Sequence, residues 1–133
     1  MKVSKKKIIY RIIVIVLLIG LACLGIYLKQ VKDYKETIKN MTFKKVNISD
    51  IADGTYVGEY NVNIISAKVE VTVKSGKISN INLLEHKNER GKTAEKVIDK
   101  VLNKQKVDVD AVSGATNSSK VIKKAIENAL IKG

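Results

Sequence analysis

An uncharged apolar run near the N-terminus limits what this chain can fold into more than any other feature. Residues 12–28 carry no charge, and counting from Ile8 with Arg11 tolerated near the end gives 21 residues. At about 1.5 Å per residue, a helix of that length spans roughly 31 Å, which is enough to cross the apolar core of a bilayer. After this run, about 80 residues show domain-like patterning, which suffices for one small domain with a modest core.

The sequence leaves three fates open for this run: a retained signal-anchor, a cleaved secretory signal or a lipoprotein signal. The run is longer than the usual core of a signal peptide, and no small-x-small cleavage site follows it, so a retained anchor is favoured. Leu21-Ala22-Cys23 is similar to the end of a lipoprotein box, in which Cys23 would be acylated, although Gly20 stands where a leucine is usual. In each case the C-terminal domain lies outside the cytoplasm, and the basic N-terminus favours the inner side of the membrane.

The formal net charge of +12 comes almost entirely from lysines spread over every segment. Such a surplus can mark nucleic-acid binding, but the chain lacks arginines interleaved with aromatic residues and matches no recognised nucleic-acid module. We therefore expect no nucleic-acid partner. Cys23 is the only cysteine and His86 the only histidine, so one chain can form neither a disulfide nor a metal site of clustered cysteines or histidines.

We divide the chain into three parts: a basic N-terminus and signal-anchor over 1–28, a juxtamembrane tether over 29–48, and a folded domain over 49–133. The tether allows two interpretations. Apolar residues recur in it at helical spacing, which indicates a stalk helix: Val31, Tyr34, Ile38 and Met41. Its charged and irregular composition indicates a solvated spacer instead, and we expect the spacer.

Residues 54–85 have the pattern of a small antiparallel sheet. Gly54–Tyr60 alternates and carries two tyrosines, while Ala67–Lys74 places valines on one face and polar residues on the other. Ser75-Gly76 has the composition of a two-residue hairpin turn, after which Lys77–Glu85 returns as the partner strand.

The third of these strands carries two further features. Ile78 is out of phase with the apolar residues that follow it, which predicts a β-bulge near Ser79-Asn80. His86 ends the strand, before a turn at Arg90-Gly91. A lone histidine is commonly a satisfied structural residue, but a position at a strand end leaves contact with a ligand open as well.

Two amphipathic helices complete the pattern. Residues 92–104 place apolar side chains at i, i+3, i+4, i+7 and i+8, and a second helix is predicted from about Ser118 to Ile131. Between them, residues 107–112 alternate like a short strand. The predicted fold class is therefore α+β: a small antiparallel sheet packed with two amphipathic helices and preceded by one N-terminal transmembrane helix.

The stretch Ser113-Gly114-Ala115-Thr116 stands just ahead of the last predicted helix. Its hydroxyls can be explained as N-caps, because serine, threonine and asparagine satisfy free amides at helix starts. The small residues between the hydroxyls leave room beside Thr116, where a phosphate would meet free amides and the positive end of the helix. With Asn117 or Ser118 as the cap, Thr116 is left free as an attachment point.

The residues Asp110-Ala111-Val112-Ser113-Gly114-Ala115-Thr116 resemble the flavinylation motif of the FMN-binding domain family. That motif is an acid, two variable positions, a serine or threonine, and then Gly-Ala-Thr. The family includes flavin-carrying subunits of the sodium-pumping NADH:quinone oxidoreductase and of the Rnf complex, and many small membrane-anchored extracytoplasmic proteins. The resemblance extends over roughly Ile51 to Leu130.

The resemblance implies that Thr116 carries FMN through a phosphoester bond. A dedicated magnesium-dependent flavin transferase that uses FAD would install it. Recognition and turn roles fall to four further motif residues: Asp110, Ser113, Gly114 and Ala115.

Three residues outside the motif are expected in the same cofactor site: Ser119, Tyr56 and His86. The chain has no tryptophan, so the flavin ring is expected to rest on tyrosine, His86 or aliphatic groups and to stay partly exposed.

By the same resemblance, the chain is expected to be an electron-transfer carrier rather than a stand-alone enzyme. It would be a single-pass protein of a bacterial cell membrane with its C-terminal domain outside. Expected partners are the flavin transferase, membrane lipid, and an electron donor such as a quinol or an NADH dehydrogenase system. Two other functions stay open: a non-redox binding or adaptor module, and a non-covalent FMN binder.

Overall fold

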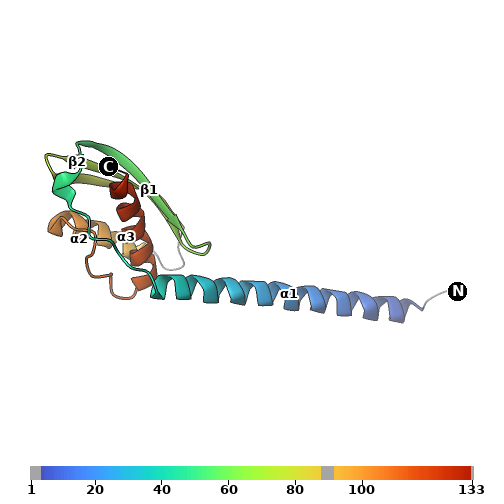
Figure 1. Cartoon of the computed structure of the whole chain (residues 1–133). Coiled ribbons are helices and arrows are strands. Elements are labelled where there is room, and N and C mark those ends of the chain that lie inside the picture. The colour runs from blue at the N-terminus through green and yellow to red at the C-terminus, as the bar shows by residue number, and fades with distance from the viewer. Residues whose placement is uncertain (1–3, 88–91, 133) are drawn as a thin grey trace. The chain divides into compact units, whose positions relative to one another are not determined.

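The computed structural model describes residues 4–87 and 92–132 (Figure 1), so the predicted turn at Arg90-Gly91 lies outside the described residues. The chain forms two compact units, one ending at Asp33 and one beginning at Tyr34. The first unit consists of the N-terminal part of helix α1. The second holds the sheet, the remaining helices and the predicted site.

Helix α1 runs over Lys5–Lys39, and within the described residues it is the one helix long and apolar enough to cross a membrane. We expected a solvated spacer after residue 28. For residues 29–39 this expectation is wrong, because α1 continues to Lys39. Tyr34 and Ile38, four residues apart on one helix face, are buried in the second unit. Their burial explains why apolar residues recur at helical spacing in this segment.

The sheet has three antiparallel strands in the order β1-β2-β3, formed by Gly54–Asn61, Ser66–Lys74 and Lys77–Lys87. The turn between β2 and β3 has positive φ at both Ser75 and Gly76, as a type I′ hairpin requires. Thr72 pairs with Asn80 while Val73 pairs with Ile78, which leaves Ser79 as an extra residue. The predicted β-bulge is therefore confirmed.

Two helices pack with the sheet in the second unit, as predicted. Helix α2 covers Lys96–Lys104 and follows a 3₁₀ turn at Thr93–Glu95, and α3 covers Thr116–Ile131. A second 3₁₀ turn, Ile48–Asp50, precedes the sheet. The predicted strand over 107–112 is wrong, because this stretch is irregular in the structure.

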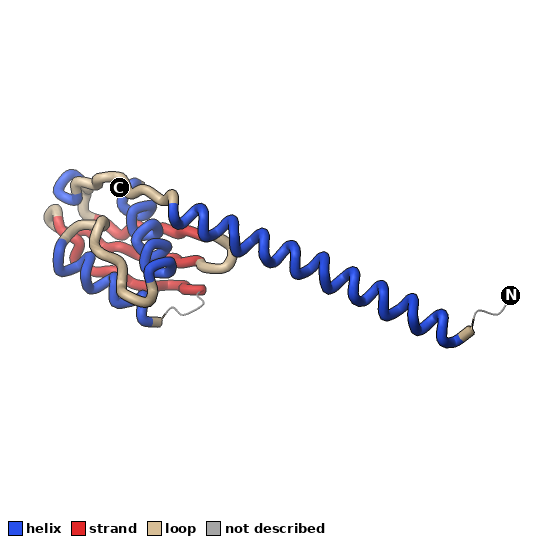
Figure 2. The backbone as a smooth tube through the Cα atoms, turned by 90° about the horizontal axis from the view of Figure 1, so that it is seen from below, coloured by secondary structure: helices blue, strands red, loops and turns tan. Residues whose placement is uncertain are grey.

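The core lies between α3 and one face of the sheet (Figure 2). Val69 and Val71 of β2 and Ile122 and Ile126 of α3 are fully buried there. Gly58 of β1 lets the helix approach closely: a Cβ at this position would lie 2.2 Å from the Ala125 carbonyl oxygen. The described architecture is thus α+β, in agreement with the sequence pattern.

Candidate functional site

The motif ends in a tight turn that leads directly into α3. The Ala115 amide donates to the Val112 carbonyl at 3.0 Å, and Gly114 between them has a φ of 81°. A positive φ at the third residue of a four-residue turn is the signature of type II, and it favours glycine because a Cβ is strained there. The glycine of the motif is therefore explained by backbone conformation, and Thr116 follows as the first residue of the helix.

The start of α3 carries no side-chain cap. Ala115 is the N-cap residue and makes no side-chain cap bond, so the expectation that Asn117 or Ser118 caps the helix is wrong. The helix begins at Thr116, two residues earlier than predicted. Ser118 and Ser119 are polar and add nothing to the hydrophobic pattern, but both are buried and belong to the packed face of the helix.

An uncapped helix start presents donors to a ligand. The first intrahelical bond near this end runs from the Ser119 amide to the Ala115 carbonyl at 2.9 Å. The amides of residues 116–118 precede it and have no intrahelical acceptor. The first turn holds no acidic residue that would neutralise the positive end of the helix dipole. Exposed Thr116 thus stands where a phosphate would be stabilised.

Ser119 holds the turn from inside the domain. Its side chain is fully buried, and its Oγ accepts a hydrogen bond from the Val112 amide at 3.1 Å. The predicted site residue Ser119 therefore supports the turn from below, whereas Ser113 and Thr116 are exposed above it.

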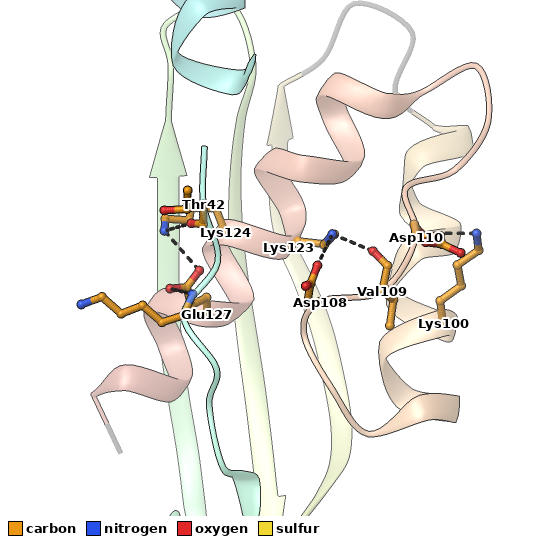
Figure 3. A network of polar contacts seen from close by, with 9 residues as sticks. Thr42, Lys100, Asp108, Val109, Asp110, Lys123, Lys124 and Glu127 are labelled. Carbon is orange, nitrogen blue, oxygen red and sulfur yellow. Dashed lines mark hydrogen bonds and ion pairs between the residues drawn. The ribbon is translucent and has the colours of Figure 1, made fainter. Parts of the chain in front are cut away.

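The irregular stretch ahead of the turn is held by lysines of two helices (Figure 3). Lys123 Nζ of α3 donates to the Val109 carbonyl at 2.6 Å, and Lys100 Nζ of α2 donates to the Asp110 carbonyl at 3.4 Å. The stretch alternates as a strand would, with Val109 buried and Asp110 exposed. Its backbone pairs with helix side chains and, at the Val109 amide, with the Val107 carbonyl at 2.8 Å, instead of with a neighbouring strand.

A cavity of about 400 Å³ opens beside the turn. Residues of the motif and of the helix start form one wall, and the rest comes from Tyr34, Lys35 and Ile65. The volume lies in the usual range for small-molecule sites. A phosphate fits the amides and the ammonium of Lys35, while a flavin ring would find few apolar groups besides Ile65 and Tyr34. These residues therefore suit a cofactor held mainly by its phosphate, with its ring partly exposed.

Sequence reasoning missed part of this wall. Tyr34 carried a signal, since it shares a helical spacing with Ile38. Lys35 and Ile65 carried none, because a lysine in a charged helix and an isoleucine in a loop are ordinary without knowledge of what faces them.

The structure places His86 inside the domain. Its side chain is 4% exposed, and its Nδ1 lies 3.7 Å from Oε1 of Glu95 in the 3₁₀ turn before α2. Burial lowers the pKa of His86 below its ordinary value, and the nearby Glu95 carboxylate partly opposes this shift. His86 pairs with Ala67 in the sheet and is absent from the residues that line the cavity.

Tyr56 lies toward the far end of the sheet from this cavity. It pairs with Val71, which is six residues from Ile65 in the β1–β2 connection, and its hydroxyl donates to the Ala52 carbonyl at 2.7 Å. The structure thus brings together the motif residues and Ser119, and it does not bring Tyr56 to them. A contact between flavin and Tyr56 or His86 stays a prediction.

The described residues contain no group of three or more histidine, cysteine, aspartate or glutamate side chains that could hold a metal ion. Comparison with curated proteins gave no match, and comparison with solved structures gave none either. The family model of the FMN-binding domain matches residues 65–131, which include both helices α2 and α3, most of the sheet and the whole motif. Because the match covers just over half of the 133 residues, the chain belongs to the FMN-binding domain family.

Proposed function

We propose that this protein is a membrane-anchored extracytoplasmic flavoprotein that carries FMN covalently on Thr116 and passes electrons between a membrane donor and a further acceptor. Membership of the FMN-binding domain family supports FMN as the cofactor. The observation that carries the attachment point is the exposed Thr116 at the uncapped start of α3, next to a cavity.

The attachment chemistry suits this position. In the active site of a magnesium-dependent flavin transferase, the Thr116 hydroxyl attacks the FMN-side phosphorus of FAD. The phosphoester bond forms, the pyrophosphate bond breaks, AMP leaves, and the hydroxyl proton is released. The resulting phosphodiester keeps a negative charge, which the free amides and the positive end of α3 stabilise.

Covalent attachment has a physical reason outside the cell, since a diffusible cofactor would be lost by dilution there. Bound flavin can exchange one or two electrons, so it can link donors and acceptors of different types. The chain's own residues supply the anchor, the turn and the amides. A membrane quinol or an NADH dehydrogenase system is the proposed donor, and α1 would keep the domain close to it.

The deciding experiment is co-expression of the full chain with and without a flavin transferase, followed by intact-mass measurement and in-gel flavin fluorescence. We expect a mass gain of one FMN less one water, only with the transferase. Thr116→Val, which keeps the size of the side chain but removes its hydroxyl, should abolish the gain.

Thr55→Val is the matched control, because it makes the same substitution at an exposed threonine of β1, outside the motif, and should leave the mass gain in place. A gain that survives Thr116→Val would refute the assignment. A colourless wild-type protein would favour the non-redox module, and a yellow protein that releases its flavin on denaturation would favour the non-covalent binder.

A further inference from the structure

The stretch that leads to the attachment turn is positioned by a buried lysine. Lys123 lies on the third turn of α3 and is 4% exposed as a residue, which is unusual for a lysine. Its Nζ donates to the Val109 carbonyl at 2.6 Å and lies 3.5 Å from the Asp108 carboxylate. Figure 3 shows the Lys123 side chain directed at both residues.

The same ammonium also contacts the segment that follows α1. Lys123 Nζ lies 4.4 Å from the centroid of the Phe43 ring, close enough for a cation–π contact. That segment is fixed on α3 independently: the Lys44 amide donates to the fully buried Glu127 carboxylate at 3.1 Å, and Lys124 Nζ donates to the Thr42 carbonyl at 3.0 Å. Lys123 therefore contacts both an aromatic ring of this segment and the stretch that precedes the motif.

We propose that Lys123 is a positioning residue for flavin attachment, because it fixes the backbone at Val109 and thereby the approach of Asp110 to the attachment turn. This inference rests on the proposed function. Among the described residues the stretch pairs with no strand, so a buried side-chain donor holds its backbone at Val109 instead. The transferase is expected to recognise the motif in one conformation. The hydrogen bond to the Val109 carbonyl keeps that conformation populated before the transferase binds.

This role has a kinetic signature. If Lys123 acts by keeping the motif in its competent conformation, its loss lowers the competent fraction and raises the apparent dissociation constant in proportion. The chemistry at Thr116 is untouched once the complex has formed. We therefore expect the KM for the acceptor protein to rise about fivefold in Lys123→Met, with kcat little changed. Lys123→Arg, which can still donate to the carbonyl, should recover most of the loss.

Lys132→Met is the matched control. Lys132 directly follows α3 and also donates through its Nζ to a backbone carbonyl, that of Val57 in β1, at 2.9 Å. Its loss removes a comparable hydrogen bond away from the motif and should leave the KM unchanged. The assay uses the full chain in detergent, purified transferase, FAD and magnesium, with flavin incorporation followed by fluorescence and the folded fraction by circular dichroism.

Equal KM values for wild type and Lys123→Met, or an equal rise in Lys132→Met, would overturn the positioning role. If Lys123→Met does not fold, Asp108→Asn replaces it, since Asp108 has a side chain that is 78% exposed and its loss should leave the fold intact. A rise of about twofold in KM is then expected, and no rise overturns the proposal. A wild-type protein that takes up no flavin would instead refute the proposed function itself.

Discussion

At the scale of single residues, two glycines of this domain meet different physical needs. Gly114 has a φ of 81° and open space around it, so its requirement is conformational. Gly58 has an ordinary backbone but faces α3 at very short range, so its requirement is steric. The motif pattern revealed the first, whereas the second depends on a helix about 70 residues further along the chain.

We predict that Gly58→Ala strongly destabilises the domain. The added methyl group would lie 2.2 Å from the Ala125 carbonyl oxygen and 2.3 Å from the Ala129 nitrogen, and both neighbours are backbone atoms that cannot rotate away. The loss in unfolding free energy should reach about 3 kcal/mol, measured by urea unfolding. Gly54→Ala in the same strand is the control, because its new methyl group would meet only the Tyr56 side chain at 3.4 Å. Similar losses for the two variants would contradict this explanation.

His86 should make stability depend on pH. Its pKa is lowered in the folded state by burial, so the unfolded chain binds more protons as the pH falls through the ordinary value of 6.5. Its contribution is fully present above that value and is lost as the pH falls toward the lower folded pKa. Wild-type unfolding free energy should therefore drop between about pH 7 and pH 5 more steeply than that of His86→Gln. Parallel curves for the two proteins would contradict the prediction.

At the scale of elements, α2 is joined to the edge of the sheet by the residue that caps its C-terminus. Gln105 ends the helix with a φ of 53°, and its side-chain amide pairs with both backbone groups of Ile78 in β3. The two distances are 2.7 and 2.9 Å. The Gln105 side chain thus makes the two hydrogen bonds that a neighbouring strand would make at the outer edge of β3. Without it, both backbone groups of Ile78 would be unpaired on this side.

Substitution of Gln105 separates this bridge from backbone strain. Gln105→Ala should cost about 2 kcal/mol of unfolding free energy, because it leaves part-buried groups of Ile78 without partners. Gln105→Gly should cost about 1 kcal/mol less than the alanine variant, because glycine accepts the left-handed conformation without strain. Thermal or urea unfolding measures both. An alanine variant as stable as wild type would show that water replaces the bridge.

At the scale of the whole molecule, α1 is expected to place the domain on the outer side of the membrane. The direct check is labelling of intact cells with a membrane-impermeant maleimide in a Cys23→Ala background. Ser75→Cys, at the exposed hairpin turn, should react without lysis. Ser4→Cys, on the basic N-terminal side of the helix, should react only after lysis. The reverse pattern would exclude the extracytoplasmic proposal.

The sequence alone determined what depends on local pattern. The apolar run, the valine alternation of β2, the Ser75-Gly76 turn and the stripes of α2 and α3 all follow from periodicity and turn chemistry, and the structure confirms these elements. The motif also identified the family, because its residues are contiguous in the chain.

Tertiary structure decided what depends on partners distant in the chain. Residues 107–112 have the alternation of a strand, but the donor they meet at Val109 is Lys123 of a helix, so they stay irregular. Residues 29–39 are charged enough for a spacer, but the burial of Tyr34 and Ile38 keeps them helical. Local pattern sets which conformations a segment can adopt, and the long-range contacts that bury its apolar groups and pair its backbone select among them.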